Sequence, residues 1–101
     1  MSPKNADETI SKIDSIIRVL SKSTPHSGLI DENDIKTINK IEEDDKPRLE
    51  GRLEDLIVLL KEEPDNKRKI LELHDTTDDE FGHLPPVFDV LDSVKKFFLN
   101  K

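Results

Sequence analysis

The chain lacks cysteine, tryptophan and tyrosine, and its 101 residues include only three glycines and one methionine. Without cysteine, neither a disulfide scaffold nor a thiolate metal site can form. We therefore expect a protein of a reducing compartment, the cytoplasm. The longest apolar run, residues 56–60, is far shorter than the roughly 20 residues that span a bilayer, and residues 1–10 hold no apolar signal segment. Membrane binding is not expected.

Basic residues are outnumbered. The chain has 23 Asp and Glu against 16 Lys and Arg, which gives a formal net charge of −7. Surfaces that bind phosphates carry an excess of positive charge, so we expect no direct nucleic-acid binding and no docking on anionic lipid. The negative charge is uneven. Residues 72–92 contain seven acidic residues and no Lys or Arg, and residues 42–45 are a second dense acidic stretch.

Apolar residues recur at helical spacing along most of the chain. Together with capping residues and prolines, they predict helices over residues 5–20, 31–45, 47–63 and 86–100. The first of these helices has Asn5 as its N-cap. Residues 65–74 fit a short helix or a strand, and helix is favoured because no second strand is available for pairing. The fold class predicted is all-α: a compact bundle of four to five short helices. It forms a single domain over residues 1–101, with fraying expected at 1–4 and 101.

Residues 74–86, HDTTDDEFGHLPP, are predicted to form a loop between two helices. Within it, Thr77 has the position of an N-cap for one short helical turn, with Glu80 three residues later. Phe81 is expected to anchor this turn in the core, and Gly82 to end it.

One glycine and the phenylalanines lead to two predictions about how the helices pack. Gly51, inside the third predicted helix, indicates a close helix crossing. Three of the four phenylalanines, Phe88, Phe97 and Phe98, fall in the last predicted helix, which is therefore expected to supply much of the central packing.

Residues with catalytic or metal-binding chemistry do not form a motif. His74 and His83 are nine positions apart across a glycine, whereas metal-binding histidines usually share one helical turn. The serines lie outside any nucleophile-elbow motif, and there is no glycine-rich phosphate loop. We predict a protein that is not an enzyme and holds no metal or other cofactor. A metal-dependent enzyme using His74 and His83 is the more distant alternative.

The acidic stretch is the strongest candidate for a functional surface. Negative charge can simply keep a small protein in solution, but it also steers and binds a basic partner. We predict that His74 lies at the edge of a partner-binding surface formed by Asp75, Asp78, Asp79, Glu80, His83, Asp89 and Asp92.

The leading hypothesis is a small acidic protein that binds another protein with a basic surface and inhibits or regulates it. Immunity proteins, antitoxins and inhibitors of nucleic-acid enzymes are of this general kind, a comparison of fold and charge alone, because no family motif is recognised. The main alternative is a helical self-association or adaptor module that pairs through Phe97 and Phe98. A monomer or a homodimer is accordingly expected.

Overall fold

The computed structural model describes residues 3–25 and 28–99, which form five helices and no strand. The helices are α1 (Pro3–Leu20), α2 (Glu32–Asn39), α3 (Lys46–Glu62), α4 (Lys67–Phe81) and α5 (Pro85–Leu99). The predicted all-α bundle of four to five helices is therefore confirmed. The choice of helix for residues 65–74 is confirmed as well, since α4 begins at Lys67.

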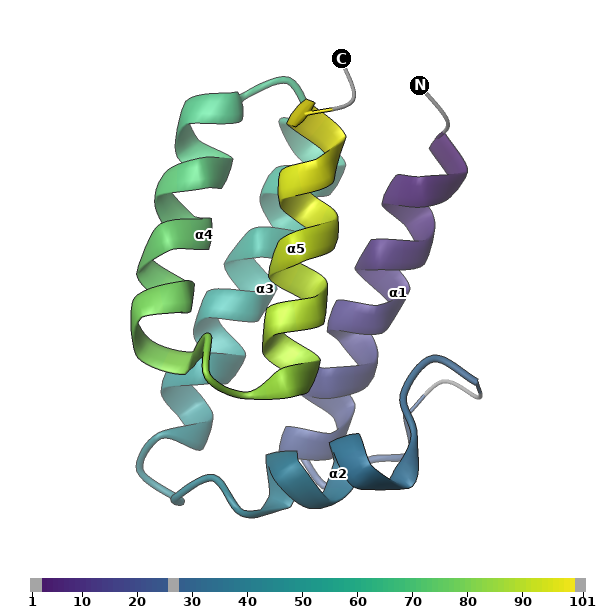
Figure 1. The fold of residues 1–101 in the computed structure, drawn as a ribbon, viewed down its shortest axis with the longest axis vertical. Helices are drawn as coiled ribbons and strands as arrows, with labels where there is room; N and C mark the ends of the chain where they lie inside the picture. Colours follow the sequence, from purple (N-terminus) through teal and green to yellow (C-terminus); the bar gives the residue numbers. More distant parts are fainter. Residues whose placement is uncertain (1–2, 26–27, 100–101) are drawn as a thin grey trace.

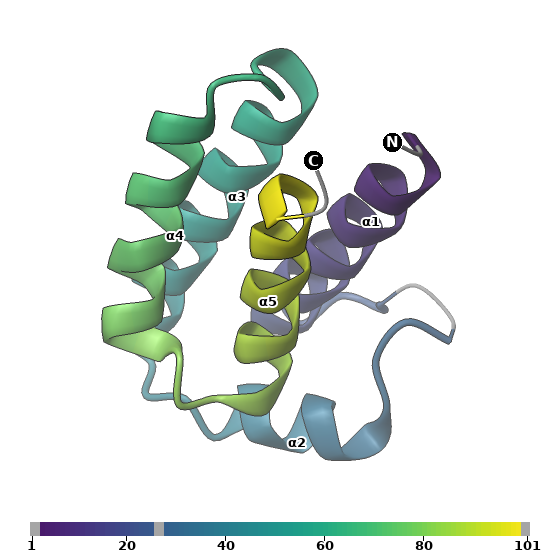
Figure 2. The ribbon, with the colours of Figure 1, turned by 45° about the horizontal axis from the view of Figure 1, so that its top comes forward.

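Four of the helices form a ring, and the fifth covers one end of it. α1 packs on α3, α3 on α4, α4 on α5, and α5 back on α1, so that α3 and α5 lie on opposite corners. α2 contacts α1 and α5 and lies across the end of the bundle at which α4 passes into α5 (Figure 1; Figure 2). None of the helices in the described part of the chain combines the length and the apolar character needed to cross a membrane.

The core is almost entirely aliphatic, because each helix turns one apolar stripe inward. A fully buried side chain of this kind contributes about 1.5–3 kcal/mol relative to an exposed one. Those that are fully shielded from solvent include Ile13, Ile16, Ile38, Leu49, Leu53, Leu56, Ile70, Val87, Val90 and Val94.

α4 is longer than the sequence predicts, and the loop expected over residues 74–81 is wrong. The buried residues of α4 follow one another at helical spacings of four, three and four: Ile70, His74, Thr77 and Phe81. Two of these four are polar, which hides the stripe in a search for apolar periodicity.

Thr77 lies inside α4 and does not cap a separate turn. Its hydroxyl donates a hydrogen bond of 2.8 Å to the Leu73 carbonyl oxygen. This bond satisfies the hydroxyl within the helix, so Thr77 can be fully buried. The anchoring of Phe81 in the core and the end of the helix at Gly82 are both confirmed.

Two other helix boundaries differ from the prediction. α1 begins at Pro3, so Asn5 lies within the helix and is not its N-cap. α2 has its expected N-cap at Asp31, whose side chain accepts from the Asp34 amide at 2.9 Å, but it ends at Asn39. The Ile41 amide then donates to the carbonyl oxygen three residues back, and this tighter turn redirects the chain toward α3. Fraying predicted at residues 1, 2 and 101 lies outside the described residues.

Of the two packing predictions, the close helix crossing at Gly51 is wrong, whereas α5 does supply much of the central packing, although not through Phe88. A Cβ added at Gly51 meets nothing within 4 Å, so no helix of the described chain crosses closely there. Phe88 is 54% exposed, and the core side of α5 is formed by valines and Leu91 instead. The side chains of Phe97 and Phe98 lie outside the described residues.

Candidate functional site

The predicted surface residues lie on the antiparallel hairpin of α4 and α5, whose connection is residues 82–84 (Figure 1). The last two turns of α4 carry four of them, Asp75, Asp78, Asp79 and Glu80. The first two turns of α5 carry Asp89 and Asp92, and the exposed His83 lies in the connection.

Glu80 faces α3 and ties it to α4. One carboxylate oxygen accepts from Arg52 Nε at 3.1 Å, and the other lies 3.6 Å from Arg48 Nη1. The Glu80 side chain is only 29% exposed. Asp78 precedes it by two residues and so lies about 160° around the helix, on the flank toward α5. Glu80 therefore stabilises the packing of α3 on α4 and points away from the other acidic residues of the hairpin.

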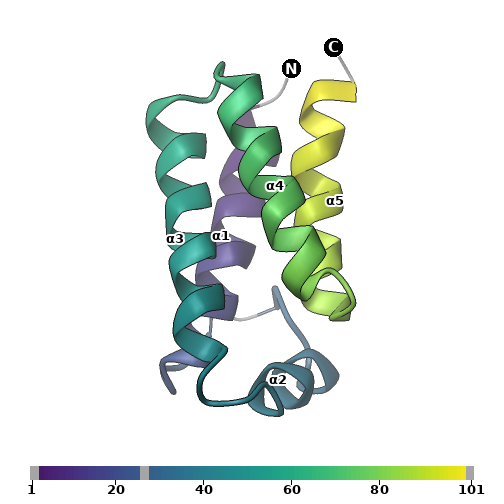
Figure 3. The ribbon, with the colours of Figure 1, turned by 90° about the vertical axis from the view of Figure 1, so that its left-hand side faces the viewer.

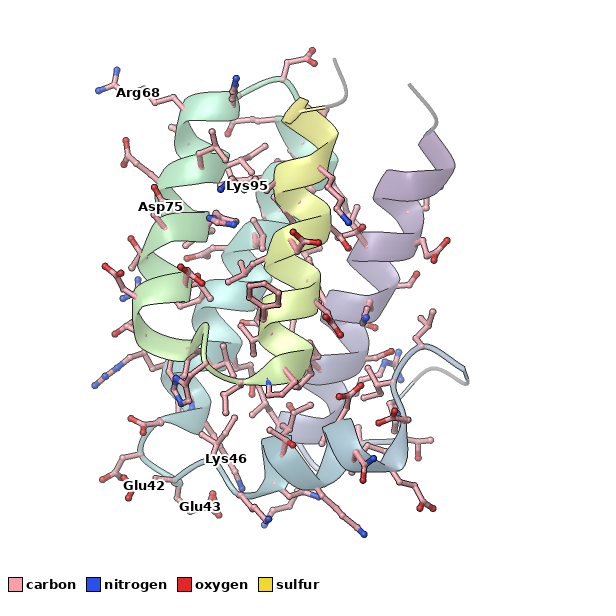
Figure 4. The ribbon with its side chains drawn as sticks, in the orientation of Figure 1. Glu42, Glu43, Lys46, Arg68, Asp75 and Lys95 are labelled. Atoms are coloured by element: carbon pink, nitrogen blue, oxygen red, sulfur yellow. The ribbon has the colours of Figure 1, made fainter. Side chains whose placement is uncertain are left out.

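Asp89 and Phe88 lie on opposite flanks of α5. Asp89 faces α1, because its carboxylate lies 3.7 Å from Lys12 Nζ. Phe88 is one residue earlier, about 100° around the helix and on the other side of the buried stripe, so it lies on the flank toward α4. Lys95 follows two turns later on that same flank, and Figure 4 shows it on the α4 side of α5.

We use the name hairpin face for Asp75, Asp78, Asp79, Phe88 and Asp92. Asp75 lies 3.0 Å from His74 Nδ1, and Asp92 lies 3.0 Å from Lys96 Nζ. Within the described residues, no Lys or Arg comes within 4.0 Å of Asp78 or Asp79. The uncompensated negative charge of the hairpin is therefore concentrated in the last turn of α4.

Phe88 is the functional candidate that the sequence analysis missed. The residues at positions 87, 90, 91 and 94 already form a complete buried stripe on α5. Position 88 lies about 100° away from that stripe. This angle is the signal in the sequence that predicts an exposed phenylalanine.

The two acidic stretches of the sequence meet in a groove at the end of the hairpin. The groove has a volume of about 340 Å³ and contains residues of α2, the α2–α3 connection, α4 and the α4–α5 connection. Arg48 lies 4.0 Å from Asp45 and 3.6 Å from Glu80, so it neutralises part of the charge where the stretches converge. Figure 4 shows Glu42 and Glu43 at this end of the molecule. The groove is lined by Thr37, Lys40, Ile41, Glu42, Asp45, Glu80, Phe81, His83 and Leu84.

The two histidines have different surroundings. His74 is buried in α4 with Nδ1 against the Asp75 carboxylate, whereas His83 is exposed and lines the groove. Across residues 3–25 and 28–99, no three side chains of His, Cys, Asp or Glu are grouped so that they could hold a metal ion. The structure therefore does not bring His74 and His83 together in one cluster.

Comparison of the chain with known proteins finds no match among family models, curated proteins or solved structures. What the chain does must be inferred from the chemistry of its surfaces.

Proposed function

We propose that this chain acts without catalysis, by binding another protein through the hairpin face and inhibiting or regulating it. The proposal rests on one observation: the hairpin carries on α5 an aromatic side chain that is 54% exposed, and on α4 two exposed carboxylates that lack a basic neighbour among the described residues. Aromatic residues are frequent anchors of protein interfaces, and unpaired surface charge steers a partner of opposite sign.

The partner in this proposal has a basic surface. The Asp75 and Asp92 side chains are 80% and 44% exposed, although each has a neighbour of opposite potential charge in the chain. The Asp92–Lys96 pair is exposed on both sides, and such pairs contribute only about 0.2–1 kcal/mol. Exchanging Lys96 for a Lys or Arg of a partner therefore costs little, and the 80% exposed Asp75 carboxylate has further lone pairs for a partner while it contacts the buried His74. Glu80 and Asp89, which face α3 and α1, contribute less to the interface.

A basic cleft that binds nucleic-acid phosphates is one surface of the required kind. Carboxylates can occupy positions that phosphates otherwise fill, because both groups accept hydrogen bonds from Arg and Lys. In an immunity-protein, antitoxin or nuclease-inhibitor role, binding of the cleft would by itself inhibit the partner.

Self-association is the second candidate, and the exposed Phe88 is the observation that favours it. Pairing two copies through their hairpin faces would set Asp78 and Asp79 of one copy near those of the other, and such like-charge contacts cost several kcal/mol at an interface, by order of magnitude. We therefore expect a monomer in light scattering at physiological salt. A stable dimer would favour the self-association candidate.

The test compares two double variants with the same change of charge. Asp78→Lys/Asp79→Lys alters the hairpin face, and Asp7→Lys/Glu8→Lys alters an adjacent exposed pair on α1. A partner is first captured from native lysate with the wild-type chain and purified, and its Kd for each variant is then measured at low and high salt.

The hairpin variant is expected to bind at least about tenfold more weakly, which corresponds to 1.4 kcal/mol. The α1 variant should remain within about twofold of the wild type, since surface substitutions away from an interface have small effects. Thermal unfolding controls for folding of both proteins. Equal affinity of the hairpin variant and the wild type would overturn the proposal.

A further inference from the structure

The outer side of α3 is a second exposed surface, on the opposite corner of the bundle from α5 (Figure 3). α3 contains five consecutive apolar residues, 56–60, of which Leu56 and Leu60 are buried in the core. The three between them reach the surface. Ile57 and Leu59 are half-buried, and Val58 is 48% exposed. A helix that is apolar beyond its core stripe has more apolar surface than the fold itself uses.

Two grooves run along either side of Val58. The groove between α1 and α3 has a volume of about 480 Å³, and the groove between α3 and α4 about 400 Å³. Both include Val58 and Asp55. The first is completed by Asp14, Ile17, Glu54 and Ile57. The second is completed by Leu59, Lys69, Glu72, Leu73 and Thr76. Each groove thus combines apolar side chains with carboxylates.

Two carboxylates beside Val58 have no cationic neighbour among the described residues, whereas Asp14 of the first groove pairs with Arg18 at 2.9 Å. In the described part of the chain, neither Glu54 nor Asp55 has a Lys or Arg within 4.0 Å. Glu72, farther out in the second groove, pairs with Arg68 at 3.7 Å. Glu54 and Asp55 are both exposed, so the negative charge next to the apolar ridge is open to solvent and to a partner.

Gly51 lies on the same outward line of α3 as Val58, seven residues earlier. Glycine inside a helix costs about 0.5–1 kcal/mol relative to alanine. Nothing in the described chain needs this glycine, because an added Cβ there meets open space. A residue without a side chain at this position does allow another helix to approach the backbone of α3 closely.

We infer that this α3 face, made of Gly51, Glu54, Asp55 and Val58 with the two grooves, binds an amphipathic helix of a partner protein that carries Arg or Lys beside its apolar residues. Long basic side chains suit the grooves, because their aliphatic stems pack on apolar residues while their charged ends reach carboxylates at the rim. Helices commonly dock in this way, with anchors spaced three or four residues apart.

A second copy of the chain does not fit this face. The chain carries a net charge of −7, and a symmetric contact would bring Glu54 and Asp55 of both copies together. Charge complementarity therefore selects a basic helix. The α3 face is separate from the hairpin face, so this inference does not depend on the function proposed above.

The probe is a synthetic helical peptide of about 18 residues, roughly five turns, with Leu along one face and Arg on both edges of that face. Control peptides replace each Arg by Glu, or keep the composition and scramble the order. Binding to the full chain is measured by fluorescence anisotropy, and the contacted amides are mapped by ¹H–¹⁵N NMR. Three protein variants are compared: Val58→Gln, Asp55→Lys and Glu8→Lys, the last being the charge-matched control at an exposed position of α1.

The expected result is saturable binding of the Leu/Arg peptide, with NMR shifts centred on Asp55 and Val58. Asp55→Lys and Val58→Gln should each weaken binding by at least about fivefold, the effect of losing roughly 1 kcal/mol at an interface. Glu8→Lys should change it by less than about twofold. The inference is overturned by absence of binding, by equal losses for Asp55→Lys and Glu8→Lys, by no loss for Val58→Gln, or by equal binding of the scrambled peptide.

Discussion

The hairpin face and the α3 face each carry one of the two large hydrophobic side chains that are exposed among the described residues, Phe88 and Val58. The two faces differ in how many of their carboxylates have a basic side chain of the same chain beside them. On the hairpin face, Asp92 lies beside Lys96, whereas Asp78 and Asp79 have no Lys or Arg within 4.0 Å among the described residues. Glu80 and Asp89, next to that face, lie beside Arg52 and Lys12. Beside Val58, neither Glu54 nor Asp55 has such a neighbour in the described chain. The density of acidic residues in a sequence therefore does not identify which carboxylates are free to bind a partner.

The largest expected effect is on the free energy of unfolding, and it distinguishes the buried side of α3 from its exposed side. Leu56→Ala removes a fully buried side chain and should lower the free energy of unfolding by about 2–5 kcal/mol. Val58→Ala, two residues away on the exposed side, should change it by less than about 0.5 kcal/mol. Urea denaturation of both variants provides the measurement. Similar losses would mean that Val58 belongs to the core and that the α3 face is not a free surface.

The next effect concerns the turn that holds the hairpin together. A Cβ on Gly82 would contact the Asp78 carboxylate and lie 2.5 Å from the Asp78 carbonyl oxygen, which is backbone and cannot move aside easily. We expect Gly82→Ala to destabilise the protein by about 1–3 kcal/mol, as other overpacked positions do. A shift in the thermal midpoint of unfolding reports this cost. An unchanged midpoint would show that the end of α4 relaxes freely.

Substitution of Gly51 by alanine should have the opposite effect on stability from Gly82→Ala, and this difference distinguishes the α3 face from the hairpin. Its Cβ position is open and its backbone is helical, so Gly51→Ala should stabilise the chain by about 0.5–1 kcal/mol. The same denaturation experiment measures the gain. A destabilised variant would contradict the open space at this position and remove Gly51 from the α3 face.

The smallest effect tests whether Glu80 is tied to α3. A double-mutant cycle of Arg52→Ala and Glu80→Gln should give a coupling energy of about 0.2–1 kcal/mol, because the pair is partly exposed and screened by solvent. The cycle of Arg52→Ala with Asp79→Asn should give a coupling near zero. Equal couplings would mean that Arg52 senses the charge of the whole hairpin and not one carboxylate.

The sequence predicts the helices with clear apolar stripes, and it fails where a polar residue occupies a core position. Leu49, Leu53, Leu56 and Leu60 of α3 and Ile13 and Ile17 of α1 are buried as their periodicity predicts. α4 is missed beyond residue 74 because His74 and Thr77 act as core residues. Their burial depends on hydrogen bonds to Asp75 and to the Leu73 carbonyl oxygen, which hydrophobic periodicity does not reveal.

The candidate surfaces are predicted less well than the fold, for a reason that lies in tertiary structure. Whether Glu80 is free depends on Arg48 and Arg52, which are about 30 residues away in sequence and adjacent in space. The free carboxylates Glu54 and Asp55 fall in a helix whose local sequence looks like ordinary solvent-facing charge. Only the packing of α1 and α4 beside them creates the grooves.

The position of α2 has a consequence for local opening. It touches α1 and α5 but is not part of the four-helix ring, and Ile38 is the one residue that its eight-residue helix buries fully. We therefore expect α2 to open locally more often than the ring does, so that its amides exchange with deuterium faster than those of α3. Since Thr37 lines the groove at the end of the hairpin, we expect a ligand bound in that groove to stabilise α2 and to slow the exchange of its amides.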